Sequence, residues 1–234
     1  MAGSGAVLVV GGSSGLGLDV ARHYANAGEQ VYVTSRDLER AQAAAADVGG
    51  NTTGLSLDLA QPESIGESVA DLGPIKYLVI TAVLRDENTA KDFKIEGATA
   101  LVTMKLIGPL ELLRVLGDRL GEGSSVVIFG GLAKERPYPG STTITTVNGG
   151  VSTMIRSLAI ELSPVRVNSI HPAVVGDSWY WADKPAAMLE GLKARTASGR
   201  LITTSDVVGA TVFLLENPGM NAHNLNIDGG WLVT

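Results

Sequence analysis

The sequence contains no cysteine among its 234 residues, which excludes a disulfide framework, a thiolate nucleophile and any zinc site built on cysteine. It has only three histidines, His23, His171 and His223, and no metal-ligand spacing links them. We therefore expect no metal centre. His171 directly precedes Pro172, which holds the backbone before it in an extended form, so we expect His171 to be structural.

Positive charge is also scarce. Lysine and arginine number 18 against 24 aspartate and glutamate residues, a formal net charge of −6, so we expect no nucleic-acid surface. The first residues show neither the basic start nor the apolar core of a signal peptide, and no apolar run is long enough to span a bilayer. We expect a cytoplasmic protein without a membrane segment, and we find no internal repeat or low-complexity tract.

Glycine, in contrast, is abundant, and three of the 29 glycines share one turn. Gly11, Gly15 and Gly17 follow the apolar run Ala6–Val10 and precede the helical stretch Leu18–Ala27. At such a turn backbone N–H groups can approach a phosphate closely, and the helix directs its positive dipole end at the anion. The order of strand, turn and helix predicts a dinucleotide site at Gly11, Ser13, Ser14, Gly15, Leu16 and Gly17.

Apolar runs and helical patterns alternate along the rest of the chain. Further strands are predicted at Val31–Ser35, Gly54–Asp58, Ile75–Thr81, Ser124–Phe129, Val165–Ile170 and Asn224–Ile227. Helices are predicted at Asp37–Val48, Pro62–Leu72, Gly97–Leu120 with a kink at Gly108-Pro109, Ile144–Leu162, and Ser205–Glu216 with Ser205 as N-cap. This alternation predicts an α/β fold: a Rossmann-like, doubly wound parallel sheet of about seven strands with helices on both faces.

Two connections differ from the short loops elsewhere. The segment Arg85–Lys94 has the composition of a charged loop. Residues 173–200 contain Pro185, three aromatic residues and a short predicted helix at Ala186–Ala194, a pattern typical of a mobile lid. We expect one nucleotide-binding domain over residues 1–234 with a substrate lid at about 173–200.

The glycine spacing resembles that of the short-chain dehydrogenases/reductases. The resemblance extends along nearly the whole chain, through Asp58-Leu59, Val167-Asn168, His171-Pro172 and Asp228-Gly229-Gly230. It implies a nicotinamide dinucleotide as cofactor, a small carbonyl or alcohol as substrate, and a homodimer or homotetramer. It also implies cofactor contacts at Asp58, Leu59, Thr81, Ala82, Pro172 and Val174.

The end of the second predicted strand indicates which dinucleotide is bound. An acidic residue there accepts the 2′-hydroxyl of NAD and repels a 2′-phosphate. This chain has Ser35-Arg36, and a guanidinium beside a hydroxyl suits a phosphate dianion, which favours NADP(H) over NAD(H). The alternative is that Arg36 is a solvated surface charge and Asp37 binds the ribose.

The catalytic residues implied by the resemblance are missing. Reductases of this family carry a tyrosine that protonates the alkoxide, a lysine one helical turn later, and a serine on the preceding strand. Aligned through Tyr138-Pro139-Gly140, these positions hold Ile144, Asn148 and Gly131. Ile144 cannot donate a proton, so we expect chemistry that differs from the usual alcohol dehydrogenase mechanism.

Two charged residues are candidate replacements. Lys105, at the position of a helix asparagine in the family, is expected to project toward the place vacated at Asn148. Asp177 is expected near the nicotinamide end, and a carboxylate beside aromatic side chains suits a cationic substrate such as an iminium ion. Reduction of an iminium ion needs only a hydride, so no tyrosine acid is required.

We therefore predict an NADP(H)-dependent oxidoreductase with a non-standard site, acting on a cationic imine or an activated carbonyl compound. The catalytic candidates are Asp177, Lys105 and Asn148, and the substrate contacts are Gly131, Tyr138, Ile144, Trp179, Tyr180 and Trp181. One alternative is an inactive NADP(H)-binding sensor or partner subunit, in which Lys105 is an exposed helix charge and Asp177 a helix cap for the segment that follows it. Another is a lyase or cyclase on the same scaffold.

Overall fold

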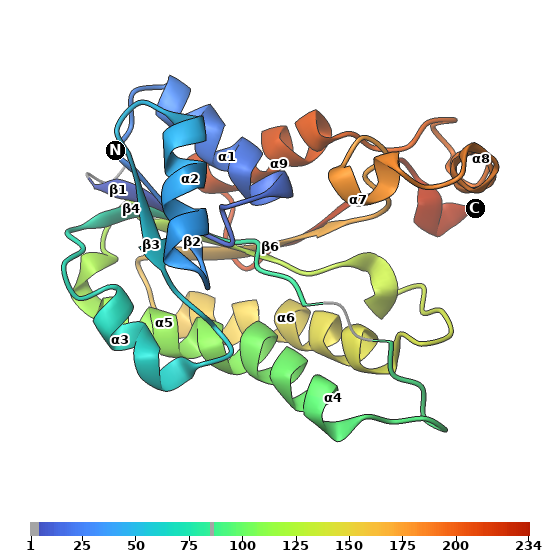
Figure 1. The fold of residues 1–234 in the computed structure, drawn as a ribbon, viewed down its shortest axis with the longest axis horizontal. Helices are drawn as coiled ribbons and strands as arrows, with labels where there is room; N and C mark the ends of the chain where they lie inside the picture. The colour runs from blue at the N-terminus through green and yellow to red at the C-terminus, as the bar shows by residue number, and fades with distance from the viewer. Residues whose placement is uncertain (1–4, 85–86) are drawn as a thin grey trace.

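In the computed structural model, which describes residues 5–84 and 87–234, seven parallel strands form one sheet (Figure 1). They are β1 (Ala6–Val10), β2 (Val31–Ser35), β3 (Thr52–Ser56), β4 (Ile75–Ile80), β5 (Ser125–Phe129), β6 (Arg166–Pro172) and β7 (Asn224–Ile227). Their order across the sheet is β3-β2-β1-β4-β5-β6-β7. The predicted doubly wound, Rossmann-like fold is confirmed.

Helices cover both faces of the sheet (Figure 1). One face carries α1 (Gly15–Asn26), α2 (Leu38–Val48) and α9 (Thr204–Glu216), and the other carries α3 (Ile65–Ser68), α4 (Ile95–Val102), α5 (Gly108–Leu116) and α6 (Thr142–Glu161). Side chains alternate along each strand, so Val7 and Val9 of β1 enter one apolar layer while Leu8 and Val10 enter the other. All five residues of β1 are buried, as expected for a strand covered on both sides.

A π-helical turn, Thr103–Ile107, joins α4 to α5. Pro109 lacks the N–H that would otherwise bond to the carbonyl of Lys105 four residues earlier, which gives a physical reason for the widened turn at this place. The predicted helix Gly97–Leu120 is therefore interrupted one turn before the predicted kink, and α5 ends at Leu116.

Several predicted boundaries are wrong. The predicted strand Gly54–Asp58 begins and ends two residues earlier, and the predicted helix Pro62–Leu72 is helical only to Ser68, because the last residues form turns such as Leu72 N to Val69 O. The N-cap of α9 is Thr203, not Ser205. Thr203 and Asp206 cap each other's backbone N–H groups, a reciprocal arrangement that Ser205 does not make.

The predicted lid contains two short helices, α7 (Trp179–Ala182) and α8 (Ala186–Lys193), which lie beside the sheet near the C-terminus (Figure 1). Of the predicted charged loop, residues 85–86 lie outside the described residues, as do residues 1–4 at the start of the chain. Among the described residues, no helix combines the length and the apolar character needed to cross a membrane.

Candidate active site

A cavity of about 890 Å³ lies at the carboxyl ends of β1, β2, β4 and β5. The strand order reverses between β1 and β4, which is where ligands bind in open α/β sheets. Most residues predicted to contact a dinucleotide line this cavity. They are Gly11, Ser13, Ser14, Gly15, Leu16, Gly17, Ser35, Arg36, Asp58, Leu59, Thr81, Ala82 and Pro172.

The glycine turn presents bare backbone to the cavity. A Cβ added at Gly17 would lie 2.5 Å from both the Gly11 carbonyl oxygen and the Thr81 hydroxyl oxygen, so no larger residue fits there. Ser14, the N-cap of α1, caps no backbone N–H with its side chain, and the first turn of α1 has no acidic residue. The free N–H groups at this helix end therefore suit an anion such as a pyrophosphate.

Two arginines line the cavity where β2 ends. Arg36 follows the strand and Arg40 stands one helical turn later on α2. Asp37 between them is the N-cap of α2, and its carboxylate accepts a hydrogen bond of 2.8 Å from the Arg40 backbone N–H. The sequence prediction missed Arg40, although its spacing from Arg36 already placed the two one turn apart.

Lys105 reaches the cavity from the π-helical turn. Its side chain is buried, with 4% of the residue exposed, and Nζ donates a hydrogen bond of 2.8 Å to the carbonyl oxygen of Phe129 at the end of β5. Burial lowers the pKa of this ammonium group to about 8. The alternative that Lys105 is an exposed helix charge is therefore wrong.

Asn148 and Gly131 lie together, outside the set of residues that line the cavity. Asn148 is buried, and its Nδ2 is 3.0 Å from the point that a Cβ of Gly131 would occupy. Among the described residues Asn148 Oδ1 has no hydrogen-bond partner. Ile144 packs at the edge of the apolar core and Tyr138 is 58% exposed, and neither of these predicted substrate contacts lines the cavity.

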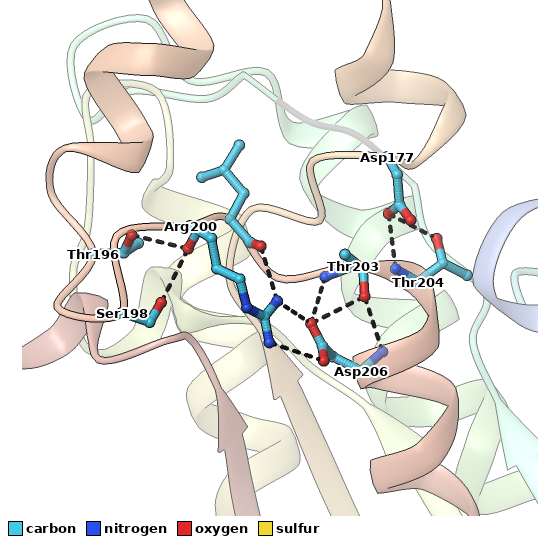
Figure 2. Close-up of polar contacts among 8 residues, drawn as sticks. Asp177, Thr196, Ser198, Arg200, Thr203, Thr204 and Asp206 are labelled. Atoms are coloured by element: carbon cyan, nitrogen blue, oxygen red, sulfur yellow. Dashed lines mark hydrogen bonds and ion pairs between the residues drawn. The ribbon is translucent and has the colours of Figure 1, made fainter.

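Asp177 also lies away from the cavity, contrary to prediction. Its exposed carboxylate accepts hydrogen bonds from the Thr204 backbone N–H at 2.8 Å and from the Thr204 hydroxyl at 3.1 Å (Figure 2). Asp177 thus satisfies an N–H in the first turn of α9, 27 residues later, and does not cap the segment that directly follows it, which was the alternative. Val174, a predicted cofactor contact, lines a separate small cavity that includes Leu192 and Trp231.

Aromatic residues of the predicted lid lie beside the glycine turn. Trp179, Tyr180 and Trp181, the predicted aromatic substrate contacts, line the cavity, and Trp179 Nε1 is 3.2 Å from the point that a Cβ of Gly15 would occupy. The Asp177–Thr204 contact joins the start of the predicted lid to the chain that follows it (Figure 2). At the end of the predicted lid, the Arg200 guanidinium bonds to Asp206 of α9, which holds the pKa of the Asp206 carboxyl well below its usual range.

His171 of β6 forms a hydrogen bond to the backbone just after the end of β5. Its buried ring accepts a hydrogen bond of 3.1 Å from the Gly131 N–H at Nδ1, so the proton of the neutral ring lies on Nε2. Nε2 is 2.9 Å from Ser169 Oγ and 3.1 Å from Asn224 Oδ1. Burial lowers the pKa of His171 to about 4, which fits the expected structural role.

The His171 ring predicts a pH dependence of stability. Its pKa is lower in the folded protein than in the unfolded chain, so the unfolded chain binds more protons between pH 6.5 and 4, and stability falls as the pH falls through this window. The loss is about 3 kcal/mol when the window is fully crossed. Urea unfolding at a series of pH values is expected to show this slope in the wild type and a much flatter slope in His171→Asn, which keeps an acceptor for Gly131. Equal slopes would contradict the assignment.

Removing the Asp177 carboxylate is expected to affect folding more than cofactor binding. Asp177→Ala leaves the Thr204 N–H without its acceptor and is expected to lower the free energy of unfolding by about 1 kcal/mol. The dissociation constant for NADPH, measured by fluorescence titration, is expected to change less than about two-fold. The matched control is Asp183→Ala, at an exposed aspartate of the same lid. A large loss of NADPH affinity in Asp177→Ala but not in Asp183→Ala would contradict a purely structural role for Asp177.

Comparison with known proteins gives consistent matches along the chain. A family model described as enoyl-(acyl carrier protein) reductase matches residues 10–232. The 3-oxoacyl-[acyl-carrier-protein] reductase of Homo sapiens is 30% identical over 230 residues, which cover 95% of each chain. A solved structure described as a short chain dehydrogenase/reductase family protein has a TM-score of 0.86 at 25% identity, over 100% of this chain and 99% of that chain. A small-chain dehydrogenase in complex with NADPH has a TM-score of 0.83 at 22% identity, over 99% and 100%.

Proposed function

The chain belongs to the short-chain dehydrogenase/reductase family, and we propose that it is an NADP(H)-dependent reductase of an activated carbonyl compound, with a non-standard active site. One observation carries this proposal: a single cavity joins an anion-binding glycine turn and two arginines to a buried lysine. When bound, NADPH supplies the hydride.

The cofactor preference rests on charge. The guanidinium groups of Arg36 and Arg40 suit the 2′-phosphate of NADPH, and Ser35 adds a hydroxyl at the same edge. The Asp37 carboxylate is bound to the Arg40 backbone, which weakens the alternative that it accepts the ribose hydroxyls of NAD. The NADPH-bound relative has this fold, and NADPH is proposed for this chain on these residues.

The substrate preference rests on which charged group faces the cavity. A cationic imine needs a carboxylate nearby, but Asp177 is bound to Thr204 and does not line the cavity. The carboxylates that do line it, Asp37 and Asp58, follow β2 and β3, on the other side of β1 and β4 from Lys105 at the end of β5. Lys105 instead places an ammonium group inside it, and a positive charge attracts a carbonyl oxygen and repels an iminium ion. The aromatic lid adds flat apolar surface. These features favour the carbonyl substrate over the imine.

A second candidate function is cofactor binding without turnover. It is favoured by Gly131, Ile144 and Asn148, none of which can supply a proton, at positions where the family resemblance implies catalytic groups. The chain would then be a sensor or the partner subunit of an active relative. For either function we also propose a cytoplasmic homodimer or homotetramer. Exposed apolar side chains along α4, the π-helical turn and α5 support this proposal, at Ile95, Ile107 and Leu110.

Single-turnover kinetics distinguish the two candidates. NADPH is mixed with excess enzyme and a panel of ketones, enones and cyclic imines, and the loss of nicotinamide absorbance is followed. Oxidation of NADPH by a carbonyl compound is the expected result, because the cavity holds both the cofactor residues and Lys105. Tight binding of NADPH without oxidation by any compound would favour the sensor.

Replacing both arginines is expected to change the cofactor preference. In Arg36→Ala/Arg40→Ala the dissociation constant for NADPH is expected to rise about 10- to 100-fold, because charge-assisted bonds to the 2′-phosphate are lost, while that for NADH changes little. Isothermal titration with both cofactors measures the ratio. Arg156→Ala, at an exposed arginine of α6, is the control. Equal losses for NADPH and NADH would contradict the NADP(H) assignment.

A further inference from the structure

The side chain of Lys105 is a buried cation that opens onto the cavity. It carries three N–H groups, and in the described part of the chain the carbonyl of Phe129 is its hydrogen-bond partner. No carboxylate of these residues lies within 4.0 Å of Nζ. A buried ammonium group without a counter-charge is costly, and the remaining N–H groups are available to an oxygen atom in the cavity.

The backbone around Lys105 places its ammonium group at the end of β5. Lys105 is the middle residue of the π-helical turn Thr103–Ile107, and such turns occur frequently at functional sites. The hydrogen bond to Phe129 fixes Nζ beside Gly130, which also lines the cavity. Lys105 therefore presents its ammonium group to the cavity at the end of β5.

The titratable groups around Lys105 are less suited than Lys105 to donate a proton to a bound substrate. His171 on β6 is neutral at physiological pH, and Lys134 after β5 forms an ion pair of 2.5 Å with Glu135. Tyr180 of the lid and Asp58 after β3 line other parts of the same cavity. Ile144, by contrast, has no proton to donate.

We infer that Lys105 is the proton donor of the reduction, taking the place of the missing tyrosine, and that the substrate is an uncharged ketone or enone. This inference rests on the proposed function. As the carbonyl carbon gains the hydride, the Lys105 Nζ–H bond breaks and an O–H bond forms on the carbonyl oxygen. The product is a neutral alcohol, and the neutral amine left on Lys105 regains its proton from water.

The protonation state of Lys105 gives the expected pH profile. Burial lowers its pKa to about 8, so the donor is charged below this pH and increasingly neutral above it. The single-turnover rate of NADPH oxidation by a cyclic ketone is expected to be constant below pH 8 and to fall about tenfold per pH unit above it. An iminium substrate of the same ring size is expected to react more slowly, because the ammonium group repels it.

Substitution of Lys105 tests the inference. Lys105→Met is expected to lower the single-turnover rate with the ketone by about 10²- to 10⁴-fold, to remove the pH dependence near 8 and to remove the solvent isotope effect. Its affinity for NADPH is expected to stay within about three-fold of the wild type, which also shows that the variant is folded. Added alkylammonium ions are expected to restore part of the rate. Lys91→Met, at an exposed lysine before α4, is the control.

The outcomes separate this inference from the proposed function. If the wild type oxidises NADPH and Lys105→Met keeps both the rate and the pH profile, the role of Lys105 is wrong and the proposed function stands. If Tyr180→Phe removes the alkaline limb while Lys105→Met does not, Tyr180 is the donor and the inference is overturned. If the iminium compound reacts faster than the ketone, the substrate class is wrong. If the wild type oxidises no NADPH with any compound, both proposals fail.

Discussion

The contact between the glycine turn and the end of β4 is the constraint on which the cavity depends. Gly17 lies so close to the Gly11 carbonyl and the Thr81 hydroxyl that only hydrogen fits between them. The Thr81 hydroxyl in turn donates to the carbonyls of Val10 and Gly11, each at 3.1 Å. This packing holds the start of α1 at the edge of the sheet, so its free N–H groups face the space where the strand order reverses.

Positive charge is then placed at two separate points of one cavity wall. Arg36 and Arg40 are exposed where β2 ends, whereas Lys105 is almost fully buried near the end of β5. A buried ammonium group is destabilising unless something compensates it, and the Phe129 carbonyl supplies only one bond. Such an arrangement is typical of functional sites, where perturbed ionisable groups gather.

The region behind the cavity is organised by a neutral histidine. His171 bonds to the Gly131 N–H, and its ring occupies the space that a side chain at Gly130 would need, since an added Cβ would lie 2.4 Å from Nδ1. A side chain at Gly130 would therefore clash with His171, whereas one at Gly131 would meet only the end of the Asn148 side chain, at 3.0 Å. His171 bonds to the backbone of Gly131 behind the cavity, and Lys105 presents its ammonium group to the cavity at the same end of β5.

The sequence by itself determined the sheet and the glycine turn, and it named most of the residues that line the cavity. The bounds of Ala6–Val10 and Val31–Ser35 follow from apolar and β-branched runs, and those of Asn224–Ile227 from alternating polar and apolar residues, all of which are local signals. Only the tertiary structure decided where Asp177 and Lys105 point. The partner of Asp177 lies 27 residues away and that of Lys105 lies 24 residues away on a different element, and contacts of that kind depend on how helices pack on the sheet, which no local pattern encodes.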